Sequence, residues 1–229
     1  MEYEVIQIDE KSWRIEENGV RSFLFVGTEK ALLVDSGFGS GDLKSVVEEL
    51  AGGLPIMLVN THADGDHIGC NSQFGVAYMH PAEFAKLATT ECASPAVPLW
   101  EGDTIAIGGR SFAVILIPGH TPGSIALFDI ANRIMIAGDS VQAGAIFMFG
   151  EHRSVPAYIA SLKKLEAWIT QFDVVYPSHG PFPVKSDIIP GLIAGAEKLL
   201  AGELEAEEPP FPVPAKLYKC DVASFLYSK

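Results

Sequence analysis

The stretch Val59-Asn60-Thr61-His62-Ala63-Asp64-Gly65-Asp66-His67-Ile68-Gly69-Cys70 decides the fold of this chain. It carries four imidazole or carboxylate side chains within six residues, directly after the apolar run Leu54 to Val59. That run is short and follows Gly53, which indicates a buried strand rather than a helix. The sequence therefore predicts a cluster of potential metal ligands at the end of a strand.

The spacing within the stretch divides these four side chains into two pairs. Residues two apart in an extended chain point the same way, so His62 and Asp64 are expected to face one ion. Gly65 permits a turn that redirects Asp66 and His67. Imidazole and carboxylate groups bind borderline and hard divalent ions, so the pattern predicts two half-sites that need further ligands.

Three candidates for these further ligands lie far down the chain, each after an apolar run. His120 lies in residues 117–124, IPGHTPGS, Asp139 ends residues 136–139, IAGD, and His179 lies in residues 176–180, YPSHG. A motif of this kind is specific only when its parts occur together and in order. The ligand stretch and all three of these later segments are present here.

With these segments in this order, the chain resembles the metallo-β-lactamase fold superfamily over about residues 20–182. The superfamily pattern is HxHxDH, then a histidine, a bridging aspartate and a last histidine, and this chain has Asp64 where the second histidine is usual. The resemblance implies an α/β fold, a four-layer αββα sandwich, and two divalent metal ions. By position, one ion would be held by His62, Asp64 and His120, the other by Asp66, His67 and His179, and Asp139 would bridge them.

The resemblance also implies a hydrolase. A hydroxide shared by two ions would attack a small ester, lactone, thioester or phosphodiester, and Asp66 would take up a proton during turnover. The extra carboxylate of Asp64 makes such a centre less electron-withdrawing than a neutral histidine would. Mn(II) and Fe(II), which are harder ions, then gain relative to Zn(II).

Two other interpretations stay open. The carboxylate at position 64 also resembles the flavodiiron proteins, which have glutamate there and reduce O₂ or NO, so a diiron redox protein with a separate partner is one alternative. Those proteins carry a fused flavodoxin domain, whereas only about 50 residues follow His179 here. A non-catalytic metal-binding sensor is the other alternative, because a fold alone does not imply activity.

Two residues are candidates to support the ligands. An acidic residue near the metal loop commonly orients a ligand histidine in the superfamily, so Asp35 is predicted to fix the tautomer and direction of such a ring. The alternative for Asp35 is a turn-capping aspartate before Gly37. Ser178, next to His179, is the second supporting candidate.

The candidates for the substrate pocket are fewer and less specific. The apolar segment 140–150 has a glycine hinge and contains Phe147 and Met148; it is predicted either to line an acyl pocket or to cover the sheet as a packed loop. Arg153 or Tyr158 would meet a carboxylate or an oxyanion, and Phe38 would flank the cleft. Each has a purely structural alternative.

Composition excludes several classes of protein. The 229 residues suit one domain with a large core. The 48% of hydrophobic residues include no run long enough to span a bilayer, and the acidic start lacks the basic region of a secretion signal, so a cytoplasmic protein is expected. A net charge of −13 disfavours nucleic acid as a substrate. Three cysteines without a CxxC spacing indicate free thiols, and no feature fixes an oligomeric state.

Periodicity predicts the elements around the motifs. A hairpin is expected over residues 20–35, helices over residues 42–50, 155–169 and 188–200, and strands near residues 104–107, 111–117, 124–128 and 133–136. Residues 203–214 are acidic and then rich in proline, and we expect a linker there within a single domain spanning residues 1–229. The tail, residues 216–227, has only a weak strand pattern.

Overall fold

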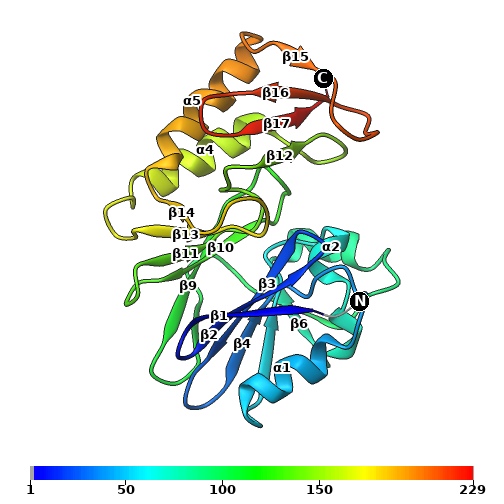
Figure 1. Cartoon of the computed structure of the whole chain (residues 1–229), viewed down its shortest axis with the longest axis vertical. Coiled ribbons are helices and arrows are strands. Elements are labelled where there is room, and N and C mark those ends of the chain that lie inside the picture. The colour runs from blue at the N-terminus through cyan, green and yellow to red at the C-terminus, as the bar shows by residue number, and fades with distance from the viewer. Residues whose placement is uncertain (1–2, 229) are drawn as a thin grey trace. The chain divides into compact units, whose positions relative to one another are not determined.

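The computed structural model describes residues 3–228, and the chain divides between Ile115 and Leu116 into two compact units. Figure 1 shows that each unit combines strands with helices. Among the described residues, no helix is long and apolar enough to cross a membrane.

The N-terminal unit is built on a seven-stranded sheet in the order β1-β2-β3-β4-β5-β6-β7. Strands β1 to β4 pair antiparallel, and β4 to β7 pair in parallel. The strands are β1 (Glu4–Asp9), β2 (Ser12–Glu17), β3 (Val20–Val26), β4 (Ala31–Val34), β5 (Ile56–Val59), β6 (Ala77–Met79) and β7 (Ala96–Pro98), followed by β8 (Thr104–Ala106) and β9 (Ser111–Leu116). The helices are α1 (Leu43–Ala51), α2 (Gly65–Ile68) and α3 (Phe84–Leu87), with 3-10 turns η1 (Asn71–Gln73) and η2 (Pro81–Glu83).

Helix α1 shows why the predicted elements of this unit form. Asp42 caps its first turn by accepting from Ser45 N–H at 3.0 Å, and Gly52 ends it in the left-handed conformation with φ 63°. Its buried stripe, which includes Leu43 and Val47, packs into one apolar cluster with residues of β3, β4 and β5. The predicted hairpin over residues 20–35 and this helix are both confirmed.

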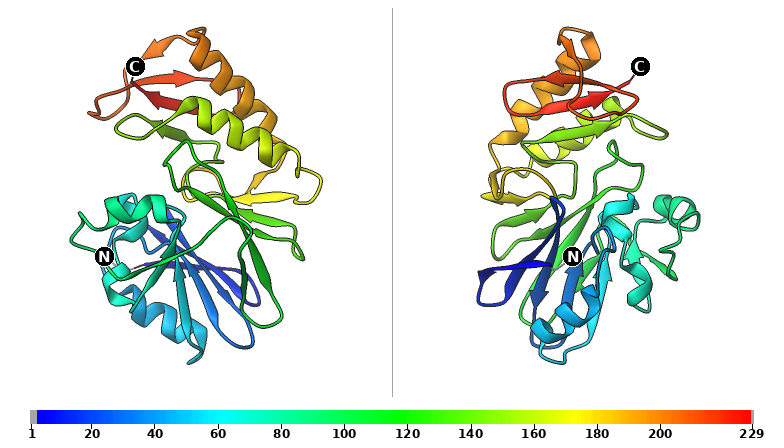
Figure 2. Two further views of the ribbon diagram at one scale, coloured as in Figure 1. Left: turned by 180° about the vertical axis from the view of Figure 1, so that it is seen from behind. Right: turned by 45° about the vertical axis from the view of Figure 1, so that its right-hand side comes forward.

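The C-terminal unit contains two groups of strands. Strands β10 (Ile125–Asp129) and β11 (Ile134–Ile136) pair antiparallel, β11 pairs in parallel with β13 (Val174–Tyr176), and β13 pairs antiparallel with β14 (Val184–Lys185). The second group is a four-stranded sheet in the order β12-β17-β16-β15, formed by β12 (Ala145–Met148), β15 (Ala206–Glu207), β16 (Lys216–Lys219) and β17 (Ser224–Tyr227). Helices α4 (Val155–Glu166) and α5 (Ile188–Ala201) lie side by side on one face of that sheet (Figure 2).

This second sheet differs from what the sequence predicts. The segment 140–150 is not a covering loop, because its residues 145–148 form β12, which pairs in parallel with β17 of the tail. The tail itself is a regular antiparallel hairpin of β16 and β17. Strand β15 lies within the segment expected to be a linker and pairs with β16. Residues 206–227 are therefore an integral part of the C-terminal unit.

Candidate metal centre

Parallel pairing brings Asp35 beside the histidine-rich loop. β4 ends at Val34 and β5 at Val59, and these two residues are paired in register. The residues that follow parallel strands emerge at the same edge of a sheet. Asp35 follows β4 directly, with a left-handed backbone of φ 63°, and its N–H donates to Val59 O at 2.8 Å.

The ligand loop, residues 60–70, arranges its candidate ligands in the predicted pairs. His62 Nε2 lies 3.5 Å from Asp64 Oδ2, and His67 Nε2 lies 3.6 Å from Asp66 Oδ2. The two imidazole rings are 4.0 Å apart between centroids. The helical turn α2, rather than a glycine turn, redirects the second pair.

Asp35 orients both histidines of this loop. Its Oδ2 accepts from His67 Nδ1 at 2.9 Å and from the Thr61 hydroxyl at 2.8 Å, while its Oδ1 accepts from Thr61 N–H at 2.7 Å. Since the Thr61 hydroxyl donates to Asp35, its oxygen accepts from His62 Nδ1, which lies 3.0 Å away. Both rings thus carry their proton on Nδ1 and present Nε2 to the candidate ligand carboxylates. The hydrogen bonds that connect Asp35 to His62 through the Thr61 hydroxyl were not predicted.

A buried polar network holds the backbone beneath the ligand loop. The side-chain amide of Asn60 donates to His67 O at 2.8 Å, and the amide of Asn71 donates to Asn60 Oδ1 at 2.8 Å. The Ser36 hydroxyl donates to Asn71 Oδ1 at 2.7 Å. These three residues are fully buried, and buried polar groups of this kind rigidify a site when they are hydrogen-bonded. The two asparagines that flank the histidines, Asn60 and Asn71, were the only feature of the sequence that indicated this network.

Cys70 ends the ligand loop, and its thiol hydrogen-bonds with Tyr3, Gly41 and Gln73 rather than with a candidate ligand. Its thiol lies 3.4 Å from the Tyr3 hydroxyl, accepts from the Gln73 amide at 3.3 Å and donates to Gly41 O at 3.7 Å. Burial raises the pKa of the Cys70 thiol, so it stays protonated and inert near neutral pH.

The turn formed by η2 and α3 touches the ligand loop at two consecutive residues. Glu83 is buried, and its Oε2 accepts from Ala63 N–H at 2.9 Å. One helical turn later, Lys86 Nζ donates to Asp64 Oδ1. Neither contact was predicted, because nothing in the local sequence of residues 81–87 points to the loop.

The three later candidates meet within the C-terminal unit because of its strand order. β11 and β13 run in parallel, so Asp139 and His179, which lie just beyond their ends, share one edge. β10 runs antiparallel to β11, so the segment before β10, which contains His120, lies at that edge too. His120 Nε2 is 3.5 Å from Asp139 Oδ2, and His179 Nε2 is 3.4 Å from Asp139 Oδ1. Each oxygen of Asp139 therefore faces a different histidine, as suits a bridging carboxylate.

The backbone around these residues fixes their direction. His120 Nδ1 lies 2.9 Å from Phe147 O, and because a carbonyl only accepts, this ring also carries its proton on Nδ1. Ser178 contributes through its N–H, which donates to Gly138 O at 3.2 Å and ties the two ligand-bearing turns together. The buried Ser178 hydroxyl has no hydrogen-bond partner among the described residues.

Several substrate-pocket candidates have structural positions instead. Tyr158 is fully buried; its hydroxyl donates to Ser140 O at 2.9 Å, and burial raises its pKa well above the ordinary value. This placement replaces the predicted contact with a substrate oxyanion. Met148 is buried in the core side of β12, and Arg153 Nη1 donates to His120 O. Phe38 is half exposed, with its N–H bonded to Glu17 Oε2 at 2.8 Å.

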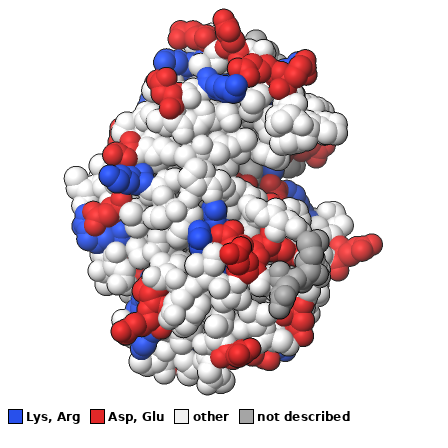
Figure 3. Space-filling view, viewed as in Figure 1, with Lys and Arg blue, Asp and Glu red and all other residues white. Residues whose placement is uncertain are grey.

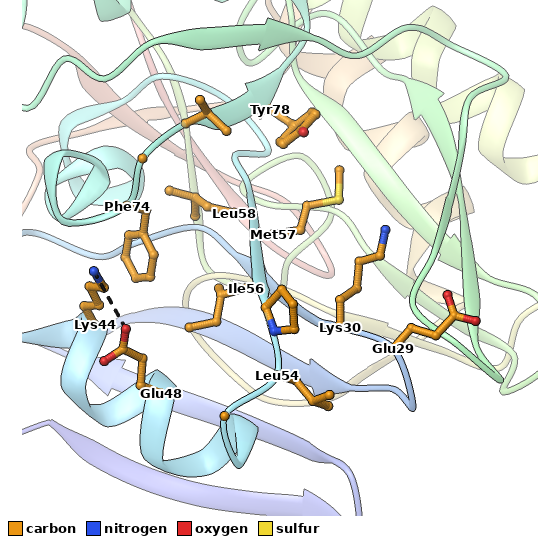
Figure 4. A pocket seen from close by; sticks show the side chains of 14 residues that line it. Glu29, Lys30, Lys44, Glu48, Leu54, Ile56, Met57, Leu58, Phe74 and Tyr78 are labelled. Atoms are coloured by element: carbon orange, nitrogen blue, oxygen red, sulfur yellow. Dashed lines mark ion pairs between the residues drawn. The ribbon is translucent and has the colours of Figure 1, made fainter.

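A separate hollow lies on the N-terminal unit (Figure 4). It has a volume of about 830 Å³ and an apolar floor that includes Ile56, Met57, Phe74 and Tyr78. Lys44 and Glu48 of α1 form an ion pair of 3.7 Å at its rim. None of the candidate ligands lines it, so it is not part of the candidate metal centre.

Comparison with known proteins identifies similar sequences. The family described as the metallo-beta-lactamase superfamily matches residues 15–179. A protein named acyl-coenzyme A thioesterase MBLAC2 in Gallus gallus is 27% identical over 207 residues, covering 72% of this chain and 75% of that protein. A hydroxyacylglutathione hydrolase of Gloeobacter violaceus is 31% identical over 126 residues, or 54% of this chain and 50% of the relative.

Solved structures match the architecture. A metallo-beta-lactamase from Pontibacter korlensis superposes with a TM-score of 0.73 and 20% identity, over 86% of this chain and 99% of that one. The DIM-1 metallo-beta-lactamase superposes with a TM-score of 0.70 and 15% identity, over 87% and 98% of the two chains. At these identities the likeness concerns the fold alone, and it confirms the mixed α/β class predicted from the sequence.

Proposed function

Because the chain belongs to the metallo-β-lactamase superfamily and the relatives with a named activity are hydrolases, it is a metal-dependent hydrolase, and we propose that it cleaves a thioester of a small acyl compound. Both kinds of named relative support this substrate class, because acyl-coenzyme A and hydroxyacylglutathione are thioesters. The structural observation that carries the proposal is Asp139, whose two oxygens face His120 and His179. A carboxylate in that position is suited to a two-metal centre.

The donor set fits two divalent ions. Each unit offers imidazole Nε2 atoms next to carboxylate oxygens, at 3.4 to 3.6 Å, and hydrogen bonds on Nδ1 fix the tautomers of His62, His67 and His120. We assign the ligands as the family pattern orders them. One ion would be held by His62, Asp64 and His120, the other by Asp66, His67 and His179, and Asp139 would be shared.

Zn(II), Mn(II) or Fe(II) bound at such a centre would supply Lewis acidity toward a carbonyl and a hydroxide nucleophile near neutral pH. The protein itself holds the ligand side chains in fixed positions and provides a side chain that takes up a proton. The Asp66 side chain is 22% exposed, so its carboxylate has access to water and is our candidate to take up a proton during turnover. We further propose that both units, with the β15 to β17 segment, act as one catalytic domain.

A cluster of aromatic rings supports the proposal that the substrate has an apolar acyl group. The rings of Phe147 and Phe149 lie 5.6 Å apart between centroids, and Phe147 stacks on Phe211 at 6.3 Å. Phe211 is 43% exposed, and Figure 3 shows mainly uncharged surface where the loop before β16 lies. The Phe147 carbonyl holds His120, so the cluster starts beside a proposed ligand. We propose that the acyl chain packs on these rings.

Replacing Phe211 with alanine is expected to weaken binding of long acyl chains and to spare short ones. The ring offers apolar area to several methylene groups, so KM for an octanoyl thioester should rise about tenfold while KM for the acetyl thioester stays within about twofold. Steady-state kinetics over a chain-length series measures this. Leu200→Ala is the matched control, since Leu200 is an exposed apolar residue of α5. Equal losses at every chain length would contradict an acyl role for Phe211.

The function is tested with purified protein, a substrate panel and metal analysis. Elemental analysis after expression with mixed Zn, Mn and Fe should find two ions per chain, and chromogenic thioesters should be hydrolysed without an electron donor. Chelator should remove both metal and activity, and re-addition of metal should restore them. Activity on esters, lactones or phosphodiesters but not thioesters would overturn the substrate class. A metal-loaded protein that hydrolyses none of them would overturn the proposed function.

A further inference from the structure

We propose that Lys86 offsets the charge that Asp64 brings to the metal centre and thereby sets its affinity and selectivity for divalent ions. The inference rests on the proposed metal centre but not on the substrate. Two independent observations lead to it. The carboxylate of Asp64 lies beside His62 Nε2, and the structure places the ammonium group of Lys86 against that same carboxylate.

The two oxygens of Asp64 have different neighbours. Oδ2 lies 3.5 Å from His62 Nε2, the ring nitrogen that carries no proton when Nδ1 donates to Thr61. Oδ1 accepts from Lys86 Nζ. Asp64 can therefore serve as a ligand through one oxygen while the other is held by a cation. Such sharing lowers the electron density that the carboxylate offers to the ion.

The position of Lys86 is fixed by its neighbour on the same turn. Glu83 is 1% exposed, and its carboxylate accepts from Ala63 N–H at 2.9 Å. Residues three apart lie on the same face of a helical turn, so Glu83 anchors the turn on residue 63 and Lys86 reaches residue 64. The pairing of Lys86 with Asp64 is thus built on a buried contact.

The charge balance explains why a lysine belongs here. A neutral side chain at position 64 would add no charge to the centre, whereas Asp64 alone adds one negative charge. Asp64 with Lys86 again adds none. Because Lys86 is 47% exposed and Asp64 is 16% exposed, solvent and salt screen this effect and keep it modest.

The test measures Zn(II) and Mn(II) dissociation constants by chelator competition on the full chain. Lys86→Met keeps the length of the side chain but removes its charge, and should tighten binding about five- to tenfold, more for Mn(II) than for the softer Zn(II). Asp64→His should weaken binding by a comparable factor. The double variant restores the charge balance, so its affinity should return to within about threefold of the unaltered protein.

Matched variants separate the charge of Lys86 from its packing and from the net charge of the protein. Lys163→Met removes one charge from an exposed ion pair with Glu197 and should leave metal affinity unchanged, while Lys86→Arg keeps the charge and should stay near the unaltered protein. Circular dichroism checks that each variant folds. Unchanged or weaker metal binding by folded Lys86→Met would overturn the charge-offset role and leave the proposed function intact. If neither Lys86→Met nor the unaltered protein bound divalent ions, the proposed centre and this inference would both fall.

Discussion

Replacing Asp139 with asparagine is expected to lower kcat/KM for thioester hydrolysis by at least about a thousandfold, because metal-ion catalysis contributes several kcal/mol and each 1.4 kcal/mol is tenfold. Asp139 presents one oxygen to His120 and the other to His179. The amide of asparagine keeps the shape but offers one oxygen and no charge. It cannot serve two ions, so bound metal should fall together with activity.

Elemental analysis and steady-state kinetics on the same sample check this result. Asp129→Asn is the matched control: Asp129 is buried in the same unit, and its carboxylate accepts from the Asn132 side chain at 2.7 Å in the turn at the end of β10 opposite to His120. That variant should lose stability but keep two ions per folded chain. Full activity of D139N would show that Asp139 is not a shared ligand.

Replacing Asp35 with asparagine is expected to weaken metal binding about 10- to 100-fold, which is the usual effect of losing a group that orients ligand histidines. Asp35 accepts three hydrogen bonds on two oxygens, from Thr61 N–H, the Thr61 hydroxyl and His67 Nδ1. An amide would turn a donor toward one of these groups. Both histidines would lose their fixed direction, since His62 is tied to Asp35 through Thr61.

Chelator competition gives the affinity, and activity measured against added metal shows whether excess metal rescues turnover. Rescue is expected, because the ligands themselves remain. Asp42→Asn is the control, since asparagine is also a good helix cap and the α1 terminus should be unaffected. An Asp35→Asn protein with unaltered metal affinity would reduce Asp35 to a turn-capping role.

The pairs within the ligand loop could be predicted because they depend on short-range geometry. A buried strand followed by closely spaced histidines and aspartates confines those side chains to one edge, whatever the rest of the chain does. The structure accordingly places His62 next to Asp64 and Asp66 next to His67, while the binding of an ion by each pair stays a prediction. The contact between Asp35 and a histidine was also expected, and the structure contains it.

Long-range contacts could not be predicted in the same way. Residues 145–148 form a strand because β17, about 80 positions later, pairs with them, and no local pattern indicates which partner a short apolar segment will find. Tyr158 is polar and near Asp139 in sequence, which predicts a pocket residue. Its hydroxyl instead finds Ser140 O inside the core. The contacts of Glu83 and Lys86 could not be predicted for the same reason.

The pairing of β12 with β17 connects the C-terminal hairpin to the candidate metal centre. The family match ends at residue 179, whereas β17 spans Ser224–Tyr227 and lies against the strand whose Phe147 carbonyl orients His120. Substitutions in β17, outside the matched residues, are therefore expected to change the orientation of His120, a proposed ligand, without altering any candidate ligand. A truncation before β16, or a bulky fusion next to β17, should therefore change the orientation of His120 although every candidate ligand is intact.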